Sequence, residues 1–291
     1  MTSLACPVCG SARVERYPTP FADPLVRCRE CGARFVHPAP SEAALRDRYE
    51  REHGSGKWRS LFEASDAAEV RRRARLLGDL LPGGARGRRL LDVGCGDGRF
   101  LDAAAGAGWT TAGTELSWEA ARAVAPRHPV VVGSLDALGP GPRFAAITFW
   151  DVLEHLPDPA AALRAAAVLL EPDGLIALSL PNAAGTGALV SGSRWRYHDV
   201  AAYGHLVHVG PRQVGRLLSR CGLATLHAET RGSVDLRDLM GEGAGGAHGP
   251  LTWLADRASG VLARLAEPAL RGNTLLVVAR CVDPPPAPPV A

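Results

Sequence analysis

Four cysteines near the N-terminus have the spacing of a metal site. They form two C-x2-C pairs, Cys6 with Cys9 and Cys28 with Cys31, separated by eighteen residues. Each pair can direct two thiolates at one point, and two pairs complete the tetrahedral shell that Zn²⁺ prefers. Because all four ligands are thiolates, the shell leaves no position for a substrate, and we predict a structural zinc site. A segment of about forty residues builds little core, so the metal would supply much of its stability.

A glycine-rich turn is the second feature that could do chemistry. The apolar run 89–93 leads into GCGDG at 94–98, and helical spacing begins at Arg99. Such a turn between a strand and a helix presents backbone N–H groups and a helix N-terminus to a ligand. Arg99 stands where the dinucleotide fingerprint has its third glycine, which disfavours an NAD-dependent oxidoreductase. The chain contains no G-K-[ST] sequence, which excludes a P-loop for nucleoside triphosphates.

Carboxylate and imidazole groups follow at places where open α/β sheets bind ligands. Glu115 lies 21 residues after Gly94, at the end of the next strand-like run. A carboxylate there can accept hydrogen bonds from both hydroxyls of a ribose. His155 follows the run 145–149, and a second group of histidines and aromatic residues occupies 195–208. Imidazoles titrate near neutral pH, so these histidines are candidates for general acid–base catalysis.

Alternating strands and helices from residue 88 onward must position these groups. The predicted helices are 99–104, 118–125, 159–170 and 211–221. Strands that alternate with helices form βαβ units and a parallel sheet. We therefore predict an α/β fold with a doubly wound, mostly parallel, seven-stranded sheet and a small N-terminal zinc ribbon. The strands of this sheet are predicted at 89–93, 110–113, 130–132, 145–149, 175–180, 223–227 and 273–280.

Other segments flank or interrupt the predicted sheet. An apolar stripe over 65–81 indicates a helix, and its arginine-rich stretch 71–75 is interpreted as a solvated face rather than a phosphate grip. Residues 251–265 could form one amphipathic helix. The proline-rich end of the chain is expected to be disordered. We divide the chain into a zinc ribbon (1–40), a helical linker (41–84), a main domain (85–282) with an insertion at about 233–270, and a tail (283–291).

The composition is that of a globular protein. The 291 residues are 46% hydrophobic and 22% charged, which excludes bulk disorder and a fibrous repeat. No apolar run approaches the ~20 residues of a membrane helix, and the N-terminus lacks the pattern of a secretory signal. We therefore expect a cytoplasmic protein, in which cysteines bind metal or stay as thiols. The net charge of +3 is too small to indicate nucleic acid by itself.

Three separated motifs together resemble one enzyme family. They read LLDVGCGDGRFL at 90–101, GTEL at 113–116 and ITFWDVLEHLPDPAAALRAAAVLLEPDGLIALSLPN at 147–182. In order and spacing they resemble class I S-adenosylmethionine-dependent methyltransferases, in the small-molecule branch with an N-terminal zinc ribbon. The resemblance covers 88–230 closely and 1–40 through the ribbon, but not 233–270. It implies a Rossmann-like methyltransferase fold, S-adenosylmethionine as cofactor, and methylation of a small molecule at O, N or C.

The resemblance also implies a role for each matching position. Residues of the first motif would line the methionine end of the cofactor, and the acidic residue of the second motif would hold the ribose. The leucine beside that residue would pack on the adenine, which the turn at 134–135 would also contact. A tryptophan would form the wall on the sulfonium side. These positions are Asp92, Gly94, Cys95, Gly96, Glu115, Leu116, Ser134, Leu135 and Trp150.

Methyl transfer from a sulfonium is an in-line displacement, so the protein mainly aligns donor and acceptor. A base is needed only when the acceptor must lose a proton. His205 is the best candidate for this base, followed by His208 and Tyr203, and His155 is placed on the substrate side. Some ubiquinone-type O-methyltransferases associate a divalent cation with a cluster like that at 151–155. Here we interpret the glutamate of that cluster as a structural hydrogen-bond partner.

Two other readings stay open. One is an rRNA methyltransferase whose zinc ribbon contacts RNA, which the arginine-rich stretch and the pI of 8.6 favour slightly. Against it, the chain has Ser-Leu-Pro-Asn at 179–182 where base-methylating enzymes have an Asn/Asp-Pro-Pro-aromatic tetrad. The other is a zinc-ribbon binding protein with a vestigial pocket, which the intact Asp92, Gly94, Gly96 and Glu115 oppose. A steep salt dependence of RNA binding would support the rRNA methyltransferase, and failure to bind S-adenosylmethionine would support the binding protein.

Replacing His205 by alanine is expected to lower turnover strongly and to leave cofactor binding intact. The reason is that the imidazole would act on the acceptor, whereas the cofactor is held by other segments. An assay of the demethylated cofactor measures turnover, and calorimetry measures cofactor binding. Equal turnover in the variant would remove His205 from catalysis.

Overall fold

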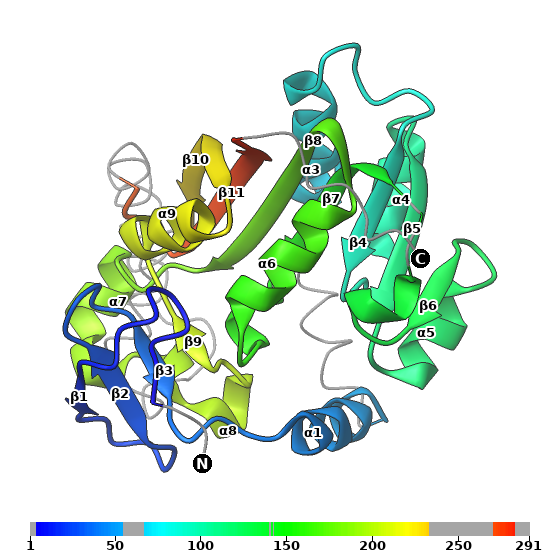
Figure 1. The fold of residues 1–291 in the computed structure, drawn as a ribbon. Helices are drawn as coiled ribbons and strands as arrows, with labels where there is room; N and C mark the ends of the chain where they lie inside the picture. The colour runs from blue at the N-terminus through cyan, green and yellow to red at the C-terminus, as the bar shows by residue number, and fades with distance from the viewer. Residues whose placement is uncertain (1–3, 55–66, 140, 142, 233–269, 283–291) are drawn as a thin grey trace, which may run out of the picture.

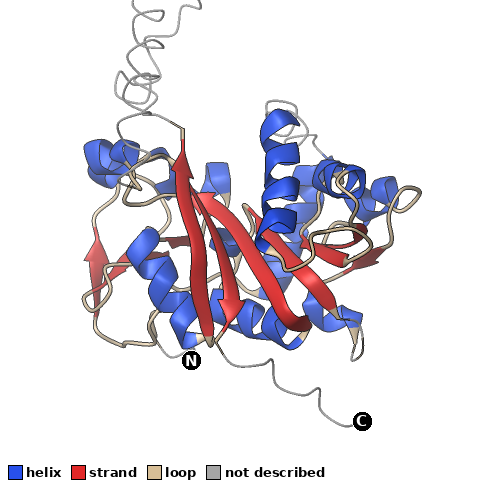
Figure 2. Cartoon of the chain, turned by 90° about the horizontal axis from the view of Figure 1, so that it is seen from above, coloured by secondary structure: helices blue, strands red, loops and turns tan. Residues whose placement is uncertain are grey.

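The structure, a computed structural model, describes residues 4–54, 67–139, 141, 143–232 and 270–282. A seven-stranded sheet with helices on both faces lies beside a smaller four-stranded sheet (Figures 1 and 2). The helix predicted at 251–265, the tail 283–291 and nearly all of the predicted insertion lie outside the described residues. Among the helices that the structure describes, none has the length and apolar character of a membrane span.

The large sheet confirms the predicted doubly wound architecture. Strand β11 runs antiparallel to both of its neighbours, and the other strands run parallel to one another. Its central strands are nearly continuous apolar runs because helices cover both faces. All seven predicted strands are present, and β8 begins five residues earlier than predicted. In spatial order the strands are β10 (Leu223–Arg231), β11 (Thr274–Cys281), β8 (Leu170–Pro181), β7 (Phe144–Trp150), β4 (Arg89–Val93), β5 (Thr110–Glu115) and β6 (Val130–Val132).

Two layers of helices bury the faces of this sheet. On one face Leu77 of α3, Leu101 of α4 and Val124 of α5 belong to one apolar cluster. On the other face Leu163 of α6 and Leu217 of α9 belong to a second cluster. Each buried helix face therefore matches one face of the sheet, as an α/β fold requires. These helices are α3 (Ala67–Leu80), α4 (Arg99–Gly106), α5 (Trp118–Val124), α6 (Pro159–Val168) and α9 (Pro211–Arg220).

The small sheet joins the N-terminal ribbon to a distant part of the chain. Strand β9 pairs with β3 in the register Arg34–His208 and Phe35–Val207. Farther along, the Gln213 side chain donates to the carbonyl of Cys31 at 2.7 Å. The ribbon is thus built onto the segment that follows β8 rather than tethered beside it. In order the strands are β1 (Val14–Tyr17), β2 (Leu25–Cys28), β3 (Arg34–Val36) and β9 (Val207–His208).

The predicted linker holds two helices that pack on the main domain. Helix α1 (Glu42–Gly54) places Glu50 where its carboxylate accepts from the backbone N–H of Trp118 at 3.0 Å. The ring of Tyr49, also in α1, meets the ring of His155 edge-on at 6.2 Å. Trp118 follows β5 (which ends at Glu115) and His155 follows β7 (which ends at Trp150), so α1 lies across the carboxyl ends of those two strands. Short elements complete the fold: α7 (Thr186–Ser191), α8 (Val200–Tyr203), and 3₁₀ turns at Leu135–Leu138, Leu153–His155, Gly192–Arg194 and Arg196–His198.

Candidate active site

The loop between β4 and α4 is shaped by glycines. Gly94, Gly96 and Gly98 have φ values of 70°, 54° and 80°, a region that side chains rarely adopt. The N–H of Gly94 donates to the Thr114 carbonyl at 2.8 Å, which draws the loop onto β5. A Cβ atom at Gly94 would lie only 2.8 Å from a methyl group of Val152. Glycine is therefore required both for the turn and for close packing.

Glu115 is tied to this loop by its side chain. Its carboxylate accepts from the Gly96 N–H and from the Ser117 N–H, each at 3.0 Å. The residue is buried at 7% exposure. Each carboxylate oxygen has a second lone pair, so Glu115 can accept further hydrogen bonds without breaking these two. The two predicted cofactor motifs are brought together, and the acidic group has a fixed orientation.

Asp92 is the buried acid beneath the loop. The Thr148 hydroxyl donates to Asp92 Oδ1 at 2.6 Å, and the residue is only 3% exposed. Burial and, to a smaller extent, nearby Glu115 raise its pKa, while Thr148 and Arg73 lower it, and the net result is a pKa of about 7 instead of 3.8. A carboxyl near half-ionisation at neutral pH becomes fully ionised when a cationic ligand group approaches it.

Arg73 reaches this site from α3, and it was not expected there. Its guanidinium lies 4.9 Å from the centre of the Trp150 ring and 3.4 Å from the Ser179 hydroxyl. The prediction that stretch 71–75 is a solvated face is wrong for Arg73, which is partly buried, and for Arg72, which pairs with Glu69. Helical spacing places Arg73 with Val70 and Leu77 on the apolar stripe, a signal that sequence reasoning overlooked, and the packing of α3 shows which groups the side chain reaches.

The segment after β7 carries backbone strain. Asp151 has a φ of 55°, a left-handed conformation that is uncommon outside glycine. Its N–H donates to the Ser179 carbonyl at 2.9 Å, which holds the strained residue at the end of the strand. Strain of this kind often marks functional sites, because surrounding structure must maintain it. Trp150 precedes it and packs edge-on against Phe100 at 5.0 Å.

The residues predicted to contact adenine lie at the ends of β5 and β6. Leu135 is buried in the 3₁₀ turn after β6, Ser134 is exposed, and Leu116 is half-buried. The Gly133 N–H donates to the Glu115 carbonyl at 2.9 Å, so this turn is joined to the residue predicted to hold the ribose. The structure therefore places the predicted adenine and ribose positions next to each other.

Glu154, His155 and His205 form a buried cluster. Each can contribute one donor atom to a group whose members all lie within 4.8 Å of one another. Both carboxylate oxygens of Glu154 lack a hydrogen-bond partner among the described residues, so its predicted role as a structural hydrogen-bond partner is wrong. Burial raises the pKa of Glu154 well above its ordinary value, and burial lowers that of His205 well below 6.5. Burial therefore disfavours the charged form of both groups.

The proton on His155 can be placed from its partner. Nδ1 lies 3.2 Å from the Gly204 carbonyl, which can only accept, so this contact places a proton on Nδ1. The ring meets that of His205 at 4.7 Å. Two imidazoles and a carboxyl group can move a proton, and they also form a donor set that suits a divalent transition-metal cation.

The remaining predicted residues surround this cluster at different distances. Tyr203 is 5.9 Å from His205 between ring centres, and its hydroxyl accepts from Arg196 at 2.9 Å. His208 is 6.4 Å from His205 and packs against His198 at 4.9 Å. His208 therefore lies behind the cluster, on the ribbon side. Tyr49 of α1, which sequence reasoning missed, completes the other side through its contact with His155.

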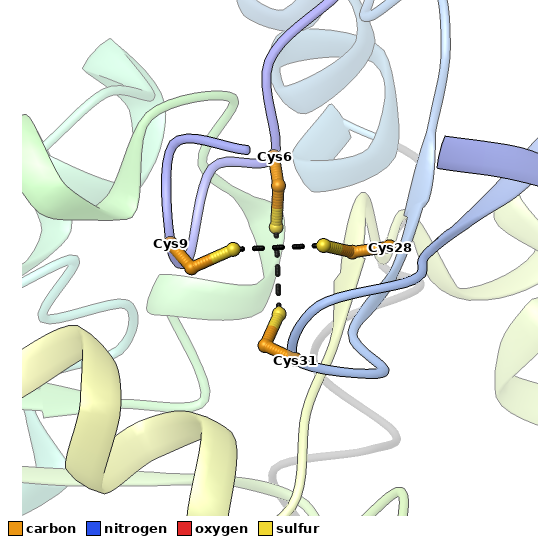
Figure 3. Close-up of side chains that lie close together, drawn as sticks. All are labelled: Cys6, Cys9, Cys28 and Cys31. Atoms are coloured by element: carbon orange, nitrogen blue, oxygen red, sulfur yellow. Dashed lines mark hydrogen bonds between the residues drawn. The ribbon is translucent and has the colours of Figure 1, made fainter. Parts of the chain in front are cut away.

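The four predicted metal ligands point at one centre (Figure 3). Cys6 Sγ lies 3.6 Å from Cys31 Sγ, and Cys9 Sγ lies 3.5 Å from Cys28 Sγ. Zn–S bonds of about 2.3 Å in a tetrahedron give S–S distances of roughly 3.8 Å. The thiol set and its geometry therefore fit Zn²⁺. With four sulfur ligands the ion would be structural.

Comparisons with known proteins agree with this geometry. A family model described as "Methyltransferase domain" matches residues 63–228, more than half of the chain. The ubiquinone biosynthesis O-methyltransferase of Thiobacillus denitrificans is 33% identical over 159 residues, which are 48% of this chain and 66% of that protein. The corresponding enzyme of Alkalilimnicola ehrlichii is 38% identical over 110 residues, 34% of this chain and 44% of that protein. The chain thus matches about half the length of these curated relatives.

Solved structures share the fold at low sequence identity. The 1,6-didemethyltoxoflavin-N1-methyltransferase of Burkholderia thailandensis aligns with a TM-score of 0.57 and 18% identity, covering 92% of this chain and all of that one (100%). A SAM-dependent methyltransferase from Archaeoglobus fulgidus aligns with a TM-score of 0.52 and 18% identity, covering 76% of this chain and 99% of that one. Both confirm the predicted fold class.

Replacing Asp92 by asparagine should change how stability depends on pH. Folding raises this pKa from 3.8 to about 7. The contribution of the protonated acid to stability is therefore fully present below pH 3.8, the pKa in the unfolded chain, and it is lost as the pH rises through about 7, the pKa in the folded chain. Relative to wild type, the ligand-free variant should gain roughly 2–3 kcal/mol of unfolding free energy between about pH 5 and pH 8. Urea unfolding measures this difference. The exposed Asp136→Asn is the control, and a pH-independent difference for Asp92→Asn would contradict the assignment.

Loss of the zinc site should loosen a segment far from it in sequence. We expect one zinc per chain, and its loss in the double variant Cys9→Ser/Cys28→Ser. Because β9 pairs with the ribbon, hydrogen exchange at Leu206–Val209 should then rise at least about tenfold, whereas β4 stays protected. Metal analysis and exchange mass spectrometry check this. Cys221→Ser removes a thiol elsewhere and should change neither result; a zinc-free variant with unchanged exchange in β9 would refute the coupling.

Proposed function

The chain belongs to the methyltransferase-domain family of class I S-adenosylmethionine-dependent methyltransferases, and we propose that it transfers a methyl group from this cofactor to a small-molecule acceptor. One observation carries the proposal. The glycine loop after β4 is hydrogen-bonded to Glu115 at the end of β5, and Asp92, which accepts from Thr148, lies beneath the loop at the carboxyl edge of the sheet, where open α/β folds bind ligands.

Opposite charges would hold the two ends of the methionine moiety. Asp92 would accept the ammonium group, and that positive charge would return its pKa toward the ordinary range. Arg73, fixed by Glu69 and the Trp150 ring, lies where it could pair with the carboxylate. Glu115 would accept the ribose hydroxyls. When bound, S-adenosylmethionine supplies a methyl group already activated on a sulfonium, so alignment is the main task of the protein.

The cluster of Glu154, His155 and His205 supports a hydroxyl acceptor. An acceptor oxygen must lose a proton during methylation, and a neutral imidazole can take it. His205 is neutral over the physiological range because burial and the neighbouring His155 and His208 lower its pKa. The curated relatives named above are O-methyltransferases, which is consistent with this choice. We therefore assign His205 as the base, with His155 and Tyr203 beside the acceptor.

The same cluster could act with a divalent cation. Glu154, His155 and His205 would hold it. Neither Glu154 oxygen has a hydrogen-bond partner among the described residues, and His205 Nε2 lies 4.0 Å from Oε1, which favours this variant of the proposal. A cation bound there would lower the pKa of a coordinated acceptor hydroxyl. The residues themselves would still position the acceptor and exclude water from it.

The geometry opposes methylation of an RNA base. Asn182, where base-methylating enzymes place part of their tetrad, is engaged in holding backbone. Its side-chain amide donates to the carbonyls of Leu270 and Gly272 at 3.0 and 2.8 Å, and its oxygen accepts from Ala184 at 3.0 Å. The residue is 1% exposed, so it is not free to bind an exocyclic amino group.

Replacing Glu115 by glutamine tests the proposal. The amide keeps the size of the side chain but loses its charge, and its NH2 group cannot accept from a backbone N–H as a carboxylate oxygen does. Both the ribose contact and the tie to the glycine loop are weakened, so affinity for S-adenosylhomocysteine should fall about 10- to 100-fold. Isothermal titration calorimetry measures this. Glu119→Gln is the matched control, because Glu119 is exposed in the first turn of α5 and should leave affinity unchanged. Wild-type protein that binds neither S-adenosylhomocysteine nor S-adenosylmethionine would end the proposal and revive a binding protein with a vestigial pocket.

A further inference from the structure

A hollow of about 570 Å³ lies between the ribbon and α7, outside the predicted cofactor site. One face of β1–β3 forms its floor, and the segment 183–192 forms the facing wall. Figure 1 shows α7 beside the ribbon strands. A volume of this size suits a small molecule. We call this hollow the ribbon pocket.

Arginines on the floor face one another. Arg27 of β2 is directly opposite Arg34 of β3 in the antiparallel register, and both line the pocket. Like charges directly opposite on one sheet face repel each other and destabilise the pairing. Two acids lie close by. Glu15 of β1 is directly opposite Arg27, but its carboxylate pairs with Arg29 at 3.0 Å, and Glu30, which also lines the pocket, pairs with Arg13. Within the part of the chain that the structure describes, neither Arg27 nor Arg34 has a carboxylate partner.

Arg34 is held in place by uncharged groups. It donates to the Tyr17 hydroxyl at 3.2 Å and to the Ala183 carbonyl at 2.9 Å. Its guanidinium lies 5.3 Å from the Tyr17 ring centre and 5.9 Å from that of Trp195. These contacts fix the guanidinium without neutralising its charge. A fixed guanidinium beside a second one is the arrangement that binds phosphate oxygens well.

The facing wall differs in chemistry from the floor. It presents Ala184, Ala188 and the 58% exposed Leu189 of α7. A ligand that matches both the floor and the facing wall has an anionic group on the arginine side and a less polar body on the α7 side.

We infer that the ribbon pocket binds the phosphate group of a phosphate-bearing small molecule, and that this group is a remote handle of the methyl acceptor. The second part rests on the proposed function. It is argued from the contacts between the two sites: Arg34 lies 5.9 Å from the Trp195 ring centre and is paired with His208 on the neighbouring strand, and the His208 ring lies 6.4 Å from that of His205. The ribbon would thus help to select phosphorylated acceptors.

Inorganic pyrophosphate is the probe, titrated by calorimetry into the full chain at constant ionic strength set with NaCl. Wild type should bind it, and Arg27→Ala should bind at least about tenfold more weakly because a charge-assisted contact is lost. Arg27→Glu should abolish binding. Arg16→Ala is the matched control: Arg16 is exposed and lies on the other face of the same sheet, opposite Val26. It should bind like wild type.

Three results would overturn the inference. The first is that wild type does not bind pyrophosphate, and the second is that Arg16→Ala and Arg27→Ala weaken pyrophosphate binding equally. The third is that binding of a short single-stranded RNA depends on Arg27 whereas binding of pyrophosphate does not. S-adenosylhomocysteine is titrated in parallel and should bind all variants equally. If S-adenosylhomocysteine binds to none of the proteins while pyrophosphate binds as expected, the ribbon pocket is still a phosphate site. In that case the proposed methyl transfer, and with it the role of the phosphate as a handle of the acceptor, is wrong.

Discussion

Hydrogen bonds between the loop after β4 and strand β5 determine the geometry on which the rest of the site depends. The N–H groups of Gly94 and Cys95 share the Thr114 carbonyl, and the Gly96 N–H donates to the Glu115 carboxylate. These contacts require that the loop approach β5 closely. A Cβ at Gly113 would lie 2.7 Å from the Cys95 sulfur, so that approach is possible only with glycine there. One loop thereby links both ends of the expected cofactor site.

Burial of polar groups gives this edge of the sheet its chemical character. Asp92, Glu154, His205 and His208 are all nearly inaccessible to water, and their charged forms are disfavoured for that reason. The fold retains them although apolar residues would be easier to bury. Asp92 is partly compensated by Thr148 and Arg73, whereas Glu154 has no comparable partner among the described side chains. Groups whose charged forms are disfavoured in this way respond to a charged or proton-donating ligand.

The ribbon contributes through backbone pairing to the ribbon pocket and to the segment that carries His205 and His208. Strand β9 is only two residues long, and its pairing with β3 extends the ribbon sheet into the segment that carries the histidines. Short strands are stable only where neighbours hold them. The expected zinc ion, the ribbon pocket and the acceptor-side histidines are therefore parts of one structural unit, although the ligands of the metal and the histidines are distant in sequence.

The sequence alone was sufficient for the fold class, the seven strands, the glycine loop, Glu115 and the cysteine set, because each depends on short-range spacing or on alternation along the chain. Tertiary structure decided what lies between distant segments. Helical spacing places Arg73 on the apolar stripe of α3, but its contact with Trp150, which follows it by 77 residues, depends on how α3 packs. The grouping of His205 with Glu154 and His155, and the opposition of Arg27 and Arg34, depend on register and on chain crossings. Such contacts arise from the burial of whole surfaces, which no local pattern encodes.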